Sequence, residues 1–221
     1  MADQITYEEL LEFKNNHPGY VIIGYVNTSA KVKTLCDVCV TSANALKIIK
    51  HFKGQKILYV PDKNLATYAN YLANGSFNVE YWNGCCDIHD ELSTNDVINM
   101  KKQYPNAEVL VHPEARLEVL KYADYIGSTK GMIDYVSKSY SKEFIVGTEL
   151  GILYSLQKQN PDKKFYKLSE KMICKTMKLT YLEDVLNALK EEGNLYTTIE
   201  LDNEVINKAS IALNKMLELG E

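Results

Sequence analysis

Short apolar runs alternate along the chain with segments whose apolar residues recur at helical spacing. Five runs are rich in β-branched or aromatic residues and occupy residues 20–26, 56–60, 108–112, 143–147 and 164–168. Runs of this length and composition are typical of buried parallel strands. The segments ALKIIKHF, LATYANYL, GMIDYVSK and LGILYSLQK lie between them and have the periodicity of amphipathic helices. The alternation predicts an α/β fold with parallel sheets.

Helices are also predicted at both ends of the chain. Near the start, Thr6 and Glu9 fit a capping box, and apolar Leu10 and Phe13 follow within the expected helix. The tail reads as one amphipathic helix that opens near Asp202.

The sequence repeats itself weakly at an offset of 87 residues, which places Asp37 on Asp124. The same offset places Tyr25, Val26 and Asn27 on His112, Pro113 and Glu114, Ser42 on Thr129, and Asp62 on Glu149; one extra residue places Cys86 on Cys174. Repeated supersecondary units produce such matches in the order of elements. We therefore predict two copies of a three-layer α/β unit with small parallel sheets, at residues 1–86 and 87–174, and a C-terminal helical segment at residues 175–221.

Composition and charge narrow the class of protein. The chain has 221 residues, of which 46% are hydrophobic and 24% charged, as in globular proteins. Its formal net charge of −4 gives no overall basic field for nucleic acid or anionic lipid. No apolar run approaches the roughly 20 residues of a transmembrane helix, and the N-terminal residues lack the apolar core of a secretory signal. We expect a cytoplasmic protein with no nucleic-acid or membrane partner, whose cysteines are reduced or metal-bound.

Candidate catalytic residues follow two of the predicted strands at matching positions of the repeat. Tyr25 and Asn27 follow the first strand, and His112 and Glu114 follow its counterpart. Ligand groups gather past the C-terminal ends of strands in α/β units, so a shared cleft would join these four side chains. His112 and Glu114 could then act as acid and base. The spacing also fits a simpler role, in which Glu114 only stabilises the first turn of a helix.

Two segments rich in hydroxyl side chains precede predicted helices at matching positions. They are TSAN at residues 41–44 and GSTKG at residues 127–131. Such residues cap the free N–H groups of a helix, and the same groups bind phosphate or carboxylate. Either site could serve for capping alone, whereas their matched positions favour a shared anion site.

The five cysteines fall into three groups. Cys36 and Cys39 have the spacing of a zinc or redox pair, but their apolar surroundings favour a buried structural role. Cys85 and Cys86 are adjacent, so one of them is better suited than the pair to bind a single metal. Cys86 and Cys174 come from equivalent loops and could converge on a soft metal. Two thiolates alone would hold an iron–sulfur cluster poorly, because clusters usually take more.

Several segments together resemble the quinolinate synthase family in order and spacing. They are GYVNTSAKVK, CVTSANALKI, LYVPDKNLATY, WNGCCDIHDEL, LVHPEARLEVLKYADYIGSTKGMIDYV, EFIVGTELGILYSLQKQNPDKKFY and MICKTMKLT. The resemblance implies similar α/β units around a pseudo-threefold axis. It also implies synthesis of quinolinate, the precursor of the NAD pyridine ring, from iminosuccinate and dihydroxyacetone phosphate. A cysteine from each unit would hold one [4Fe–4S] cluster, whose remaining iron is open to substrate.

The resemblance assigns roles to individual residues. A Gly-x-Cys-x-x-His pattern selects Cys86, with His89 following, and a Met-x-Cys pattern selects Cys174, as cluster ligands. Asp87 and Lys175 follow these cysteines where the family often has proline. The implied catalytic residues are Glu114, Tyr25 and His112. The implied substrate-binding residues are Tyr25, Val26, Asn27, Ser42, His112, Pro113, Glu114 and Thr129.

The first of the family's three units has no counterpart in this chain, which begins Met1-Ala2-Asp3. The cluster cysteine and the substrate-binding residues of that unit are missing with it. We therefore expect a truncated quinolinate synthase of the condensing and dehydrating type, complete only with a first-unit chain in trans. The alternative is a non-catalytic two-domain α/β protein that binds a small anion or a metal.

Overall fold

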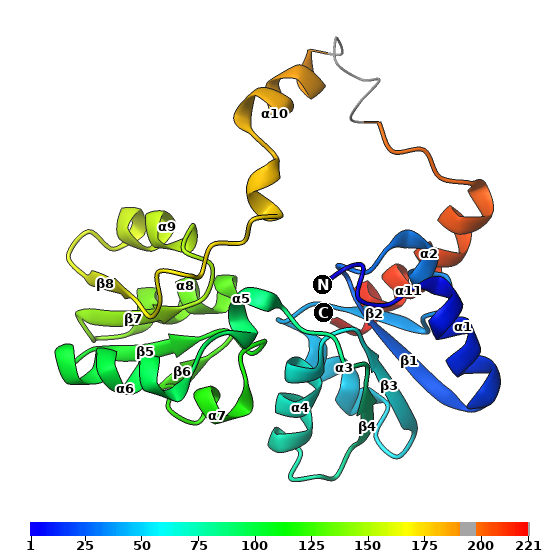
Figure 1. The fold of residues 1–221 in the computed structure, drawn as a ribbon, viewed down its shortest axis with the longest axis horizontal. Helices are drawn as coiled ribbons and strands as arrows, with labels where there is room; N and C mark the ends of the chain where they lie inside the picture. The colour runs from blue at the N-terminus through cyan, green and yellow to red at the C-terminus, as the bar shows by residue number, and fades with distance from the viewer. Residues whose placement is uncertain (191–197, 221) are drawn as a thin grey trace.

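The computed structural model describes residues 1–190 and 198–220. Its two four-stranded sheets form two α/β units that lie side by side (Figure 1). The strand order is β2-β1-β3-β4 in the first sheet and β6-β5-β7-β8 in the second, and all pairings are parallel. The predicted fold class is therefore confirmed.

The elements of the first unit alternate regularly along the chain. They are α1 (Tyr7–Asn16), β1 (Tyr20–Tyr25), α2 (Ala30–Lys33), β2 (Val38–Val40), α3 (Ala45–His51), β3 (Lys56–Val60), α4 (Lys63–Leu72) and β4 (Asn78–Tyr81). The second unit follows with α5 (Asp87–Asp90), α6 (Thr94–Gln103), β5 (Glu108–Val111), α7 (Leu117–Leu120), β6 (Tyr125–Ile126), α8 (Thr129–Lys138), β7 (Glu143–Gly147), α9 (Ile152–Gln159) and β8 (Lys164–Lys167). The C-terminal part contains η1 (Met177–Leu179), α10 (Leu182–Leu189) and α11 (Asn203–Gly220).

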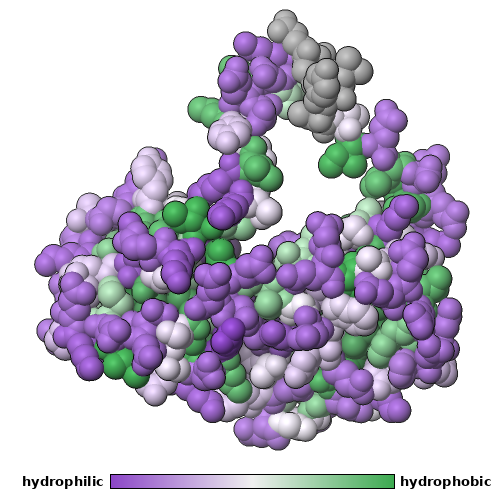
Figure 2. Space-filling view, viewed as in Figure 1, coloured by the Kyte–Doolittle hydropathy of each residue, from purple (hydrophilic) through white to green (hydrophobic). Residues whose placement is uncertain are grey.

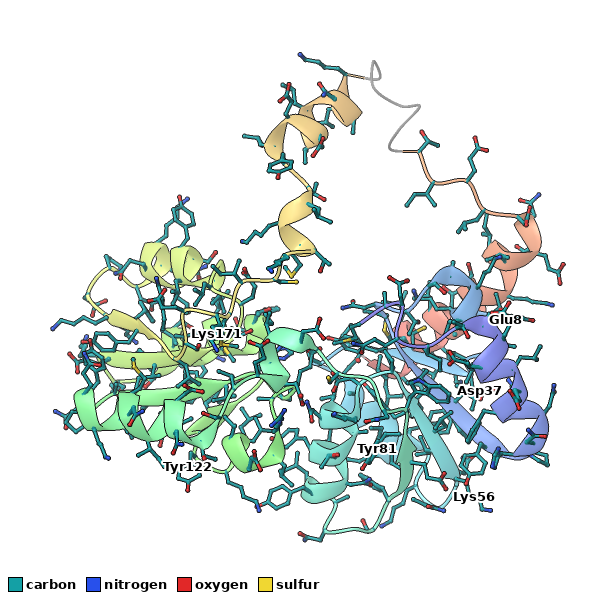
Figure 3. All side chains as sticks on the ribbon, in the orientation of Figure 1. Glu8, Asp37, Lys56, Tyr81, Tyr122 and Lys171 are labelled. Carbon is teal, nitrogen blue, oxygen red and sulfur yellow. The ribbon has the colours of Figure 1, made fainter. Side chains whose placement is uncertain are left out.

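The two units repeat one another at the predicted offset. The pairs α1 and α6, α2 and α7, and β3 and β7 match it at both of their ends. A side-chain contact repeats as well: the Asp37 carboxylate accepts a hydrogen bond from Ile22 N at 2.7 Å, and the Asp124 carboxylate accepts one from Val109 N at 2.8 Å. Figure 3 labels Asp37. The unit boundaries at residues 86 and 174 stay a prediction.

Each sheet is covered by helices on both faces because the strand residues are apolar on both sides. In β1, Ile22 packs in a cluster with residues of α1, α2 and α11, whereas Val21 and Ile23 pack with residues of α3 and α4. The Thr6 capping box at the start of α1 is confirmed, since the Thr6 hydroxyl accepts from Glu9 N and the Glu9 carboxylate accepts from Thr6 N. No helix in the described residues is long and apolar enough to cross a membrane.

The predicted tail helix is confirmed as α11. The sequence pattern did not indicate where this helix packs, and the structure places it against the first unit. It packs on β2, α2 and α3 of the first unit, where Ala209 and Ala212 are buried. The chain passes from the second unit through α10 before it returns to the first, and its two ends are drawn close together (Figure 1). The first unit is therefore built from both ends of the chain.

The contact between β1 and Cys36 gives a test of this core. Cys36 and Cys39 are buried free thiols, which agrees with a structural role. A Cβ atom at Gly24 would lie 2.6 Å from Cys36 Sγ. We expect Gly24→Ala to lower the free energy of unfolding by about 1–3 kcal/mol because it overpacks the core. Urea unfolding measures the change.

The second substitution Cys36→Ala should restore much of this loss, because it removes the clashing sulfur atom. The coupling energy of the two changes should therefore be favourable and about 0.5–3 kcal/mol. Cys39→Ala is the matched control and should leave the clash in place. Strictly additive effects of Gly24→Ala and Cys36→Ala would contradict this packing.

Candidate active site

Side chains from both units meet past the carboxyl ends of the strands. Tyr25 ends β1 and Asp62 follows β3 in the first unit. Glu114 follows β5 and Thr148 follows β7 in the second unit. The short helix α5, which carries His89, lies where the two units meet (Figure 1). Side chains fill this junction, whereas the labelled Lys56 and Tyr122 lie at the outer margins (Figure 3).

The carboxylate of Glu114 is the centre of this group, and the residue is only 4% exposed. Its Oε2 lies 3.0 Å from His89 Nδ1 and 3.6 Å from His112 Nδ1. The two imidazole rings stack with centroids 4.5 Å apart. Tyr25 also forms a side-chain hydrogen bond with Glu114. Three predicted catalytic residues, Glu114, Tyr25 and His112, therefore lie together, while their roles stay a prediction.

The surroundings of these groups set their protonation at neutral pH. Burial acts to raise the pKa of Glu114, but the hydrogen bond from His89 and the neighbouring imidazoles lower it to about 2. Burial lowers the pKa of His112 to about 4. Burial and then the charge of Glu114 raise the pKa of Tyr25 well above its ordinary value. The site thus combines a charged carboxylate, a neutral imidazole and a protonated phenol. The carboxylate of Glu114 can accept a proton, and the phenol of Tyr25 can donate a hydrogen bond.

His89 is more central than its sequence position suggested, since the motif gave it only as the histidine three positions after Cys86. Its Nε2 lies 3.0 Å from the Thr148 hydroxyl, and its Nδ1 lies 3.1 Å from Cys86 Sγ. The donor atoms of Cys86, His89 and Glu114 all lie within 4.8 Å of one another, so these residues could hold a metal ion. Burial and then the charge of Glu114 raise the pKa of the Cys86 thiol.

Asp62 fixes the loop that presents Cys86, and sequence reasoning gave it no role. Its carboxylate is fully buried and accepts hydrogen bonds from Leu65 N at 2.7 Å and from Cys86 N at 3.1 Å. Burial and then the charge of Glu114 raise its pKa to about 7. An aspartate just before a predicted helix was a signal for the helix cap. The second contact, to a residue far along the chain, had no local signal.

The loops that carry Cys86 and Cys174 are held in the same way in the two units. In each unit, the residue after a buried carboxylate donates a backbone hydrogen bond to the residue two positions before the cysteine. These bonds are Lys63 N to Gly84 O at 2.8 Å and Leu150 N to Met172 O at 2.9 Å. The match includes the extra residue of the predicted repeat, so Cys174 has the same place in its unit as Cys86.

A polar network joins the two units beside this site. Asn64 of α4 is buried, and its Nδ2 donates to the Glu114 carbonyl at 3.0 Å and to Asp90 Oδ1 at 2.8 Å. The other carboxylate oxygen of Asp90 accepts from Arg116 at 2.9 Å. The hydrogen bond from Arg116 is the main reason that the pKa of Asp90 is lowered to about 2. These contacts were not predictable from any single motif.

A cavity of about 370 Å³ lies between α3, α4 and α8 and is lined by parts of both hydroxyl-rich segments. Ser42 and Pro113 contribute to its wall, as do Gly127, Ser128 and Lys130. Ser128 caps α8 through its hydroxyl, so capping is confirmed there. Ser42 instead forms a side-chain hydrogen bond with Tyr25. The two segments therefore share one cavity, which is the geometry that an anion site between them requires.

The remaining predicted site residues are Val26, Asn27, Thr129 and Cys174. Val26 is half-buried and donates its backbone N–H to Val40 O at 2.8 Å. Asn27 and Thr129 are exposed, and Cys174 is half-buried. Within the described residues, the metal-competent group does not include Cys174. The binding roles predicted for these four residues thus stay predictions.

The fold and the site together define a protein of repeated parallel α/β units with a buried cluster of titratable side chains between them. The family model described as quinolinate synthetase A protein matches residues 1–218. A quinolinate synthase of Caldicellulosiruptor bescii is 45% identical over the whole chain, which covers 71% of that relative. Those of Caldicellulosiruptor saccharolyticus and Clostridioides difficile are 46% and 40% identical, again over the whole chain and 71% of the relative. The chain belongs to the quinolinate synthase family, an enzyme family of NAD biosynthesis. The non-catalytic alternative is not favoured.

The contact between Asn64 and Glu114 leads to a prediction about unit packing. We expect Asn64→Leu to lower the free energy of unfolding by about 1–3 kcal/mol, because it leaves a buried carbonyl without its donor. Asn99→Leu is a matched control on the exposed face of α6 and should stay within about 0.5 kcal/mol. Urea unfolding compares the two. Equal effects would mean that the amide does not hold the units together.

His112 leads to a prediction about pH. Its pKa is about 4 in the folded protein against an ordinary value of 6.5, so the unfolded chain binds more protons between these limits. The stabilising effect of a neutral His112 is therefore present above pH 6.5 and is lost as the pH falls toward 4. We expect the free energy of unfolding of wild type relative to His112→Gln to decrease by about 2 kcal/mol between pH 7.5 and 5.

Urea unfolding of both proteins at several pH values tests this linkage. Asp62 has a raised pKa and acts in the opposite direction over part of the same range, but comparison with the variant cancels its contribution. A difference between the two proteins that does not change with pH would show that His112 titrates alike in the folded and unfolded states.

Proposed function

We propose that this chain supplies two of the α/β units of a quinolinate synthase that condenses iminosuccinate with dihydroxyacetone phosphate and releases phosphate and water. The observation that carries the proposal is the buried Glu114 carboxylate between His89, His112 and Tyr25. Condensation and dehydration need a group that takes up and returns protons. A charged carboxylate beside a protonated phenol is suited to this chemistry.

Each catalytic side chain has a role that follows from its protonation. Glu114 takes a proton from the substrate and returns it in a later dehydration. Tyr25 keeps its proton and donates a hydrogen bond to a developing negative charge, because its pKa is raised. His112 is neutral at pH 7 and helps to position the carboxylate, since its Nδ1 lies 3.6 Å from Glu114 Oε2.

The cavity between the units would receive the anionic groups of the substrates. Ser42 and Ser128 bring hydroxyl groups, and Lys130 brings a positive charge that is paired with Asp134 of the same lining at 3.0 Å. Asn27 and Thr129 would complete this binding surface, with Val26 and Pro113 shaping it. Hydroxyl groups and backbone N–H groups at a helix start suit both phosphate and carboxylate.

The thiols of Cys86 and Cys174 have the chemistry of iron–sulfur ligands, and they occupy equivalent places in the two units. They would hold two iron atoms of a [4Fe–4S] cluster, and a further thiolate would come from a polypeptide equivalent to the remainder of the relatives. When bound, the cluster supplies a Lewis-acidic iron for substrate oxygens. We place the protein in the cytoplasm, where both thiols stay reduced.

The apolar surface of the C-terminal segment supports a further polypeptide in the assembly. Leu182 is 85% exposed and Leu189 is 78% exposed, both on α10. Figure 2 shows this segment standing away from the body, with hydrophobic residues on its surface. An uncovered apolar face of this kind favours association. The occupant that we propose is a polypeptide equivalent to the part of the relatives that this chain does not match.

Co-expression tests the proposal. The chain is produced alone and together with the part of a relative that it does not match. We expect a soluble brown complex that makes quinolinate, and no activity from the chain alone. Glu114→Gln in the complex should keep the colour and reduce turnover by about 10²–10⁴-fold, because the amide cannot accept a proton.

The exposed Glu118→Gln on α7 is the matched control and should keep turnover. Two results would overturn the proposal. One is a monodisperse chain that makes quinolinate alone at an enzymatic rate. The other is near-normal turnover of the Glu114→Gln complex, which would remove Glu114 from proton transfer.

A further inference from the structure

Cys86, His89 and Glu114 bring three different donor atoms to one point. His89 Nδ1 lies 3.1 Å from Cys86 Sγ and 3.0 Å from Glu114 Oε2, and all three atoms lie within 4.8 Å of one another. Ligands of a tetrahedral zinc ion, at about 2.0–2.3 Å from the metal, are separated by about 3.3–3.8 Å. The observed spacing is therefore close to that of a bound ion, and small side-chain shifts would complete it.

The imidazole of His89 is oriented as a metal ligand would be. Its Nε2 lies 3.0 Å from the buried Thr148 hydroxyl, and its ring stacks on that of His112. In the metal-free chain Nδ1 donates to Glu114; in the tautomer that donates from Nε2 to Thr148, the lone pair of Nδ1 would face the thiol and the carboxylate, as a metal requires. Metal-binding histidines are commonly held in this way through the nitrogen that does not touch the metal.

In the metal-free chain, hydrogen bonds hold the three groups together, because the Cys86 thiol and the His89 ring each form a side-chain hydrogen bond with Glu114. A metal ion would take the place of these hydrogens. Asp62 places a second carboxylate nearby, and its Oδ2 already accepts from Cys86 N. A divalent cation would bind the sulfur, the nitrogen and the oxygen together and would offset the negative charge.

The donor set also indicates which ions fit. One thiolate, one imidazole and one carboxylate match zinc or ferrous iron, whereas calcium and magnesium prefer oxygen ligands. Three protein ligands leave a fourth position open, as in sites where a zinc ion carries a water molecule. Binding would release the proton of the Cys86 thiol.

We propose that Cys86, His89 and Glu114 form a mononuclear site for a divalent transition metal of the zinc type. Occupation of this site and of an iron–sulfur cluster is mutually exclusive, because both require the Cys86 sulfur. A zinc ion here also takes the Glu114 carboxylate away from proton transfer. Zinc is thus an inhibitor that acts on the chain before any cluster is assembled. Metal binding by these three residues is argued from the geometry of the chain alone, whereas the inhibitory effect rests on the proposed function.

Metal titration of the reduced, metal-free chain tests the proposal. Zinc affinity is measured by competition with a chromophoric chelator, and cobalt serves as the spectroscopic probe. We expect one tightly bound equivalent and a thiolate-to-cobalt charge-transfer band. His89→Gln and Cys86→Ser should weaken zinc binding by about 10-fold or more. Thr148→Val, which removes only the hydroxyl beside His89, should weaken it by about 10–100-fold.

Two controls separate this site from the other thiols. Cys85→Ser alters the adjacent half-buried thiol and should leave the affinity unchanged. The double variant Cys36→Ser/Cys39→Ser removes the buried Cys-x-x-Cys pair and should also bind one equivalent normally. Tight binding that survives Cys86→Ser but is lost in the double variant would overturn the proposal.

The test does not depend on the folding of any single variant. Cobalt binding to the wild-type chain without a thiolate band would exclude Cys86 as a ligand. Unchanged zinc affinity in Thr148→Val, with the folded state checked by thermal unfolding, would exclude the orientation assigned to His89. Either outcome would overturn the site.

Discussion

The burial of one carboxylate governs the arrangement of this protein. Glu114 is almost wholly removed from water, and an unpaired charge in such a position would cost several kcal/mol. Its partners come from different places: His112 from the same loop, His89 from α5, and Tyr25 from the first sheet. The two imidazoles belong to the unit of Glu114, and the phenol reaches it only when the two units are packed together, so the site is completed at the unit interface.

The secondary structure could be predicted well because its signals are local. The run at residues 143–147 is apolar on both faces and became β7 with the same bounds, since burial on both sides selects that composition. Thr6 and Glu9 satisfy one another within one turn, so the helix start is encoded in a few residues. The repeat also helped to predict the secondary structure, because a weak pattern in one unit was supported by the equivalent segment of the other unit.

The site could be predicted only in part. Glu114, Tyr25 and Cys86 were expected from strand ends and motifs, and the structure brings them together. Asp62 and Thr148 were missed because their contacts join residues that are far apart in the chain, for which a single sequence carries no periodic signal. Asn27 was predicted from a strand end, as Tyr25 was, yet its side chain is exposed. A position at a strand end thus predicts proximity to the site and does not predict burial in it.

The return of α11 to the first unit has a consequence for the synthesis of the protein. A ribosome makes the chain from its N-terminus at about 5–20 residues per second, and the first sheet can form early. The face that Ala209 and Ala212 cover stays open until the last helix has left the ribosome. During that interval, the whole second unit must emerge and fold while tethered to an incomplete neighbour. Of these two units, the one that is translated earlier is therefore the one that is completed later.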